Sequence, residues 1–226
     1  CIRDSLKVIL KGKILKKSPM EILGLIFLDA EAYLGKRDVI LNTVEANSPE
    51  DVVMLLSKYS FGKEIQQAYA AYKETNNINA IDIFLDKAFI NLIIDAFGRL
   101  TLEEYYTCKE IIAIDVDYYN ILSLLRGKFL DFDISLQREI IAKRSFKIPI
   151  ETLYNLISTE SIEECINVLR NSYYRDIFSE EIKSASDIPL LEKKFKVLMY
   201  NVSKQTFLRS SFTLDVGLAY IKLKEI

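Results

Sequence analysis

Histidine is absent from this sequence of 226 residues, and cysteine, glycine and proline are scarce. The lack of histidine excludes histidine-based acid/base catalysis, nucleophilic triads that rely on histidine, and His-ligated zinc. Neither a Gly-x-x-x-x-Gly-Lys-Ser/Thr loop nor a Gly-x-Gly-x-x-Gly motif is present, which excludes those two nucleotide-binding devices. Cys1, Cys108 and Cys165 lack metal-ligand spacing and predict reduced, packed thiols. We therefore expect no catalytic, cofactor-binding or metal-binding residue.

Long apolar runs are also missing. The longest candidates, residues 22–28 and 88–94, fall far short of the roughly 20 residues that span a bilayer, so we expect no direct transmembrane span and see no signal peptide. Seven glycines and four prolines leave little material for the tight turns of a sheet protein. The sequence predicts an all-α fold of roughly a dozen helices, and we expect the chain to be incomplete at both ends.

Four helix starts stand out. Residues 48–51 (Ser-Pro-Glu-Asp) place a capping serine before a proline at the first helical position. Residues 161–164 (Ser-Ile-Glu-Glu) and 101–104 (Thr-Leu-Glu-Glu) have the form of a capping box, in which the glutamate reaches back to the capping residue. Residues 187–189 (Asp-Ile-Pro) form a weaker start. Apolar residues three and four apart follow these caps, which is typical of amphipathic helices.

Charge is uneven along the chain although the formal net charge is only −2. Residues 1–17 hold six basic residues against one acid, and residues 101–120 hold five acids against one lysine. Solvated helix faces explain both segments; docking surfaces for partners are the alternative. The weak net charge gives no global field for nucleic acid or an anionic membrane.

An internal repeat of about 115 residues is the most informative pattern. Residues 10–13 (Leu-Lys-Gly-Lys) recur as residues 125–128 (Leu-Arg-Gly-Lys), and residues 48–59 match residues 161–172. A further match joins residues 85–89 to 191–195, and residues 220–226 repeat features of residues 105–111. We predict repeat units at residues 1–100 and 101–210 and the start of a third at 211–226.

The repeated glycine, Gly12 and Gly127, is costly inside a helix, by about 1 kcal/mol relative to alanine. It predicts that another helix backbone approaches closely, or that the helix bends or ends. The basic residues Arg126 and Lys128 beside it either cap carbonyls at a helix end or bind acidic partners.

Two other groups of residues are weighed for chemistry. Asp115 and Asp117 are conceivable as a carboxylate pair for a metal or for acid/base work, but an exposed turn of a long helix is the favoured interpretation. The 13 tyrosines and 12 phenylalanines are conceivable as base-stacking platforms. Because they sit at helical spacing without a basic groove, core packing is favoured and no nucleic-acid partner is expected.

Residues 117–128 (Asp-Tyr-Tyr-Asn-Ile-Leu-Ser-Leu-Leu-Arg-Gly-Lys) resemble the "Asp, Asn-Ile, Leu-Arg-x-Lys" signature of the C subunit of archaeal-type rotary ATPases, whose vacuolar counterpart is the d subunit. Residues 162–174 and 191–195 are similar to that family's following segments, and residues 220–226 resemble the start of its third repeat. The first copy departs from the pattern, since Ser5 stands where Asn120 stands and Lys11 replaces the arginine.

The resemblance implies a funnel-like, pseudo-threefold helical subunit of the central stalk. It implies a non-catalytic role between the rotor shaft subunits (D and F type) and the membrane proteolipid ring, coupling ATP turnover to proton or sodium transport. It further implies a peripheral place on the cytoplasmic face of a membrane within a heteromeric complex. The candidate partner-binding residues are Lys11, Lys13, Asn120, Arg126 and Lys128.

Two other classes of function remain open from the residues alone. The first is an all-helical scaffold or adaptor that mediates protein–protein interactions. The second is an enzyme that uses aspartate, glutamate or lysine chemistry. Neither needs a third basic pair about 115 residues beyond Lys128, which the rotary interpretation predicts.

Overall fold

The computed structural model describes residues 2–59, 61–209 and 216. These residues form twelve α-helices and one 3-10 helix and contain no strand, so the predicted all-α class is confirmed. The chain divides into two compact units, residues 1–89 and residues 90–226. The helix α7 (Asn79–Phe97) contributes to both.

The first unit is built on α1 (Ile2–Ile14). The other helices of this unit are α2 (Pro19–Leu23), α3 (Leu28–Tyr33), α4 (Arg37–Val44), α5 (Pro49–Leu56), α6 (Gly62–Thr75) and the first part of α7. Helix α1 packs against α2, α4 and α5, and it buries Leu6, Ile9 and Leu10. These three residues lie three and four positions apart, the spacing that places side chains on one helix face.

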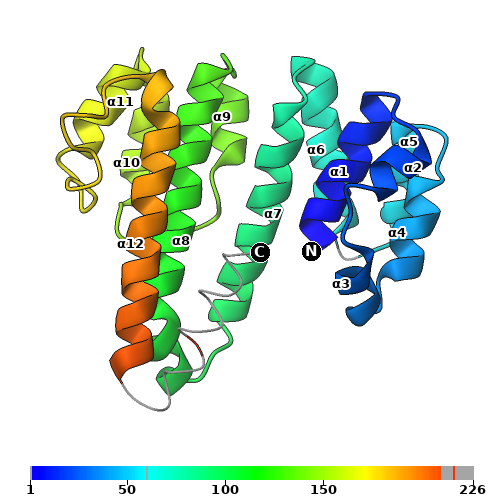
Figure 1. Ribbon diagram of the computed structural model, residues 1–226. Coiled ribbons are helices and arrows are strands. Elements are labelled where there is room, and N and C mark those ends of the chain that lie inside the picture. Colours follow the sequence, from blue (N-terminus) through cyan, green and yellow to red (C-terminus); the bar gives the residue numbers. More distant parts are fainter. Residues whose placement is uncertain (1, 60, 210–215, 217–226) are drawn as a thin grey trace. The chain divides into compact units, whose positions relative to one another are not determined.

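The second unit is built on α8 (Leu102–Phe129), the longest helix in the described chain. Around it lie α9 (Ile134–Ile140), α10 (Ile150–Ile157), α11 (Ile162–Leu169) and α12 (Ile188–Arg209), with a 3-10 turn at Ala185–Asp187. Helix α8 packs against all four, and Figure 1 shows α12 running beside it. Because neighbours cover α8 on several sides, fourteen of its residues are buried, polar ones included.

The predicted helix starts at Ser48 and Thr101 are confirmed. Each side chain accepts a hydrogen bond from the backbone N–H three residues on, and Thr101 forms the complete capping box with Glu104. Ser161 also caps its helix, but Glu164 accepts from the N–H of Glu160 rather than reaching Ser161. That part of the prediction was wrong, because the carboxylate reaches one residue further back.

The C-terminal ends of α1 and α8 have the same backbone geometry. Lys16 and Asp131 both lie in the left-handed region, with φ of 56° and 52°. The residue after each donates its N–H to the carbonyl of Gly12 or Gly127, at 2.9 Å in both cases. This hydrogen bond, from a residue just past the helix back into its last turn, is the Schellman motif.

Gly12 and Gly127 occupy equivalent places in these two ends. A Cβ on Gly12 would lie 2.7 Å from Cγ1 of Ile22 in α2, and one on Gly127 would lie 2.8 Å from Cδ1 of Ile140 in α9. The close neighbour is therefore a side chain of the following short helix, not a helix backbone. Each long helix ends two residues later, at Ile14 and Phe129.

These matched ends support the predicted repeat. The predicted unit boundaries, 1–100, 101–210 and 211–226, describe repetition in the sequence rather than compactness, and they stay predictions. The third copy, at residues 220–226, lies outside the described residues, as does Cys1. The pseudo-threefold, funnel-like arrangement likewise stays a prediction.

Candidate docking site on helix α8

Two predicted partner-binding residues, Lys11 and Arg126, lie in ion pairs within their own units. The amine of Lys11 is 2.7 Å from Oδ2 of Asp82 on α7, and a guanidinium nitrogen of Arg126 is 2.5 Å from Oε1 of Glu192 on α12. In both units a basic residue of the central helix, α1 or α8, thus contacts a later helix, α7 or α12. All four side chains are partly exposed, which weakens such pairs.

Lys128 binds the end of another helix. Its amine donates to the carbonyls of Ile157 and Thr159, at 3.0 and 2.6 Å, where α10 ends. Carbonyls at a helix C-terminus have no partner within the helix and attract cations. The capping role considered for the sequence is therefore the one observed, although the helix is α10 rather than α8.

Lys13 and Asn120 differ sharply in accessibility. Lys13 is half-buried, and its side chain has no partner among the residues that the structure describes. Asn120 is 0% exposed, and its amide bonds to the backbone on either side of Lys143. It donates to the carbonyl of Arg144 at 2.9 Å and accepts from the N–H of Ala142 at 2.8 Å. The side chain of Asn120 therefore holds a loop in place, and its predicted role in partner binding stays a prediction.

Asp115 and Asp117 do not form the exposed turn that the sequence favoured; this interpretation was wrong. They are only 3% and 0% exposed. Asp117 accepts four hydrogen bonds. Its Oδ1 accepts from Ser145 Oγ at 2.7 Å and Phe146 N at 2.8 Å, and its Oδ2 accepts from Lys147 N at 2.7 Å and the Tyr174 hydroxyl at 2.9 Å. Buried charges persist when they are fully hydrogen-bonded.

Asp117 therefore ties two segments to α8 that are far apart in the sequence. One is the loop of residues 143–147, which we name the basic loop, and the other is the turn that carries Tyr173 and Tyr174. Burial and the neighbouring Asp117 carboxylate both raise the pKa of Tyr174, so its hydroxyl keeps its proton and remains a donor. The place of Asp117 within the largely apolar residues 111–125 is the sequence signal from which its burial could have been predicted.

The basic loop carries Lys143, Arg144 and Lys147. Lys143 forms an ion pair with Asp95. Lys147 lies 2.8 Å from Glu110, with its amine 4.9 Å from the centre of the Tyr173 ring. Burial lowers the pKa of Lys147, but the hydrogen bond and charge of Glu110 outweigh it, and the pKa is raised overall.

Arg144 differs from both lysines of the basic loop. Its side chain is exposed and has no partner within the described part of the chain. Arg144 and the other residues of the segment 143–150 line a shallow cavity of about 290 Å³. The cation of Arg144 is therefore available at the surface.

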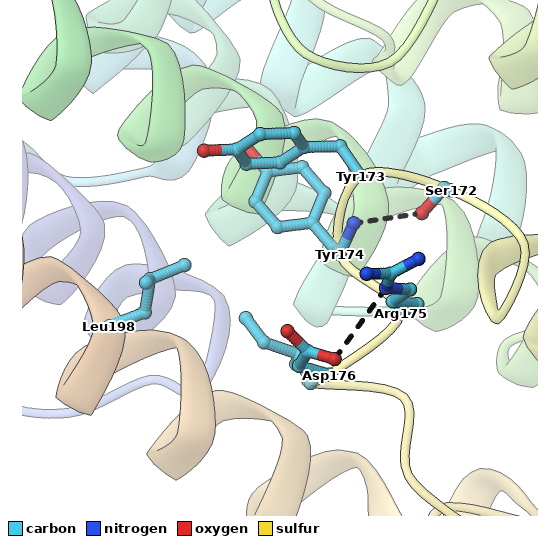
Figure 2. A pocket seen from close by; sticks show the side chains of 7 residues that line it. Ser172, Tyr173, Tyr174, Arg175, Asp176 and Leu198 are labelled. Carbon is cyan, nitrogen blue, oxygen red and sulfur yellow. Dashed lines mark hydrogen bonds and ion pairs between the residues drawn. The ribbon is translucent and has the colours of Figure 1, made fainter.

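A larger cavity, of about 490 Å³, lies beside the tyrosine turn. Residues 172–177 and Leu198 of α12 line it. Figure 2 shows the two tyrosine rings on one side and Asp176 and Leu198 on another, and the rings of Tyr173 and Tyr174 meet edge to face at 5.1 Å. Arg175 pairs weakly with Asp176 across 3.7 Å at the rim. The cavity thus offers an apolar wall with a polar edge.

Among the described residues no group of three His, Cys, Asp or Glu side chains is placed to hold a metal ion. Within the same residues, none of the helices combines the length and apolarity needed to cross a bilayer. The site described above consists of the buried carboxylate of Asp117, the buried amide of Asn120 and the loop that they hold.

Comparison with known proteins identifies the family. The family model for the ATP synthase (C/AC39) subunit matches residues 3–226. The chain belongs to this family. The resemblance noted in residues 117–128 is thereby confirmed.

Three curated relatives are all named as the C subunit of an A-type ATP synthase. The protein of Methanothermobacter thermautotrophicus is 20% identical over 225 residues, which cover 98% of this chain and 57% of that protein. The protein of Methanocaldococcus jannaschii is 22% identical over 185 residues, or 80% of this chain and 46% of that protein. The protein of Methanosphaera stadtmanae is 18% identical over 186 residues, which cover 81% of this chain and 48% of that protein. The chain thus spans about half the length of these relatives, and no solved structure matches it.

Proposed function

We propose that this chain is a non-catalytic central-stalk subunit of an A/V-type rotary ATPase or ATP synthase. It couples the rotor shaft of the soluble head to the membrane proteolipid ring, and so links ATP turnover to proton or sodium transport. The observation that carries the proposal is the family match over residues 3–226. The same complex gives it a peripheral place on the cytoplasmic face of the membrane.

The internal chemistry of the chain supports a mechanical role. Its polar groups are used to fix helices and loops to one another: Asp117 and Asn120 hold the basic loop, and Lys128 holds the end of α10. A protein that transmits force must resist deformation, and close-packed interiors do so because they have low compressibility. Charged groups at its surface then set the register with the neighbouring subunits.

The test uses the whole complex with a tag on the full-length version of this chain. We expect the tag to recover both the D- and F-type shaft subunits and the proteolipid ring. When the gene is deleted, we expect the detached head to keep hydrolysing ATP while ATP-driven ion pumping by membrane vesicles stops. Recovery of neither the shaft nor the ring, or loss of hydrolysis by a fully assembled head, would overturn the proposal.

A further inference from the structure

Resting on the proposed function, we infer that Arg144 binds a carboxylate on an acidic segment of a neighbouring protein of the complex. Three observations carry this inference: the fixed backbone of the basic loop, the exposed cation that the loop leaves unneutralised, and the ion pairs that neutralise the two lysines of the same loop. They are taken in turn below.

The backbone of the basic loop is fixed on both sides of Arg144. Asn120 bonds the N–H of Ala142 and the carbonyl of Arg144, and Asp117 bonds the N–H groups of Phe146 and Lys147. Burying a charged carboxylate is costly unless it is fully bonded, and a plain connector between α9 and α10 needs no such anchor. Fixing the loop reduces the conformational entropy that binding would otherwise cost.

The fixed loop leaves one cation unneutralised. Lys143 and Lys147 are paired with Asp95 and Glu110, whereas the exposed guanidinium of Arg144 has no partner in the described chain. A guanidinium presents a planar fork of donors that matches a carboxylate with two parallel hydrogen bonds. The loop therefore presents the cation type best suited to a single, oriented carboxylate.

The surrounding charges select the kind of partner. Nucleic acids and anionic membranes attract clusters of several cations. Lys143 and Lys147 of the basic loop are already paired with Asp95 and Glu110, so the loop offers one free cation and not a cluster. A protein segment with one or a few carboxylates fits this pattern, because a single guanidinium is enough to bind a carboxylate.

The experiment compares two charge reversals in the same unit. Arg144→Glu is the test and Arg138→Glu, an exposed arginine on α9, is the matched control. Each full-length variant is titrated separately onto the tagged head and onto the tagged ring, both purified from cells that lack this gene. Breaking a desolvated charge pair at an interface typically weakens binding by tenfold or more, and we expect about that loss for Arg144→Glu, none for Arg138→Glu, and partial retention for Arg144→Lys.

Binding of the wild-type chain is also expected to fall with added salt, and less so in Arg144→Gln. Melting curves show whether each variant is folded. We expect unchanged melting temperatures, because the substituted side chains are exposed. Equal binding by Arg144→Glu and Arg138→Glu would overturn this inference while leaving the proposed function intact. If the wild-type chain itself binds neither the head nor the ring, the proposed function fails, and the inference that rests on it fails too.

Discussion

Lys16 and Asp131 share one backbone conformation, left-handed with φ of 56° and 52°, at positions 115 residues apart. Each lies two residues after the end of a long helix, α1 or α8, and is followed by a short helix, α2 or α9. For a residue with a Cβ this conformation costs about 1–2 kcal/mol, and aspartate tolerates it better than lysine does. The two positions therefore store strain at the same place in each unit.

Replacing Lys16 with glycine should release that strain. We expect Lys16→Gly to raise the free energy of unfolding by about 0.5–1 kcal/mol, and Asp131→Gly to raise it less. Urea denaturation at constant m-value measures the change. Lys17→Gly is the control, because Lys17 does not have a positive φ and glycine there only adds freedom to the unfolded chain. Equal effects at positions 16 and 17 would contradict the strain argument.

Asp117 should be the most sensitive polar residue of the second unit. Asp117→Asn places an amide donor against groups that themselves donate, and we expect a loss of about 3 kcal/mol or more, since breaking a buried charged network leaves donors unsatisfied. Tyr174→Phe removes one of the four donors and should cost about 1 kcal/mol. Asp176→Asn, at an exposed carboxylate, should cost almost nothing. Thermal melts of the three variants rank the effects. A small loss of stability in Asp117→Asn would contradict the role of Asp117 in holding the basic loop and the tyrosine turn to α8.

Substitutions of Arg126 and of Lys128 should differ in how much they lower the free energy of unfolding. The partly exposed pair of Arg126 with Glu192 should be worth less than about 1 kcal/mol, so Arg126→Gln is expected to be mild. Lys128→Met leaves two carbonyls at the end of α10 without their donor and should cost about 1–2 kcal/mol. Lys13→Glu should leave stability unchanged. If Lys128→Met instead weakens assembly at unchanged stability, the residue serves a partner.

The capping box at Thr101 predicts a specific acid dependence. Hydrogen bonds from the backbone and side chain of Thr101 lower the pKa of Glu104 below its ordinary value of 4.5. A lowered folded-state pKa contributes stability above about pH 4.5, and this stability is lost as pH falls through the folded pKa. The stability gap between wild type and Glu104→Gln should be present at pH 7 and shrink below pH 4.5. A gap that does not depend on pH would contradict this assignment.

Local chemistry made the helices predictable from the sequence. The capping residues Ser48, Thr101 and Ser161 act within three residues of their own positions, and so their roles are visible in the spacing alone. The end of α8 after Gly127 was predictable for the same reason. The family was recognisable because the segment that carries its signature, residues 117–128, is intact in this chain.

Long-range contacts were not predictable in the same way. Asp117 was interpreted as exposed because a carboxylate on a helix usually faces solvent, and its donors lie 28 to 57 residues further along the chain. Arg126 and Lys128 were recognised as basic residues at a helix end, but Glu192 and the end of α10 lie 66 and 29 residues away. Spacing within one helix contains no information about such partners.

The reach of the Asp117 hydrogen bonds also bears on the order of folding. Because its donors come from the basic loop and from Tyr174, the carboxylate is fully bonded only after α9, α10 and α11 have returned to α8. Closing such loops costs entropy before any contact compensates it. The hydrogen bonds to Asp117 thus form in a late step of folding. Tyr174→Phe should therefore speed unfolding while leaving the folding rate nearly unchanged.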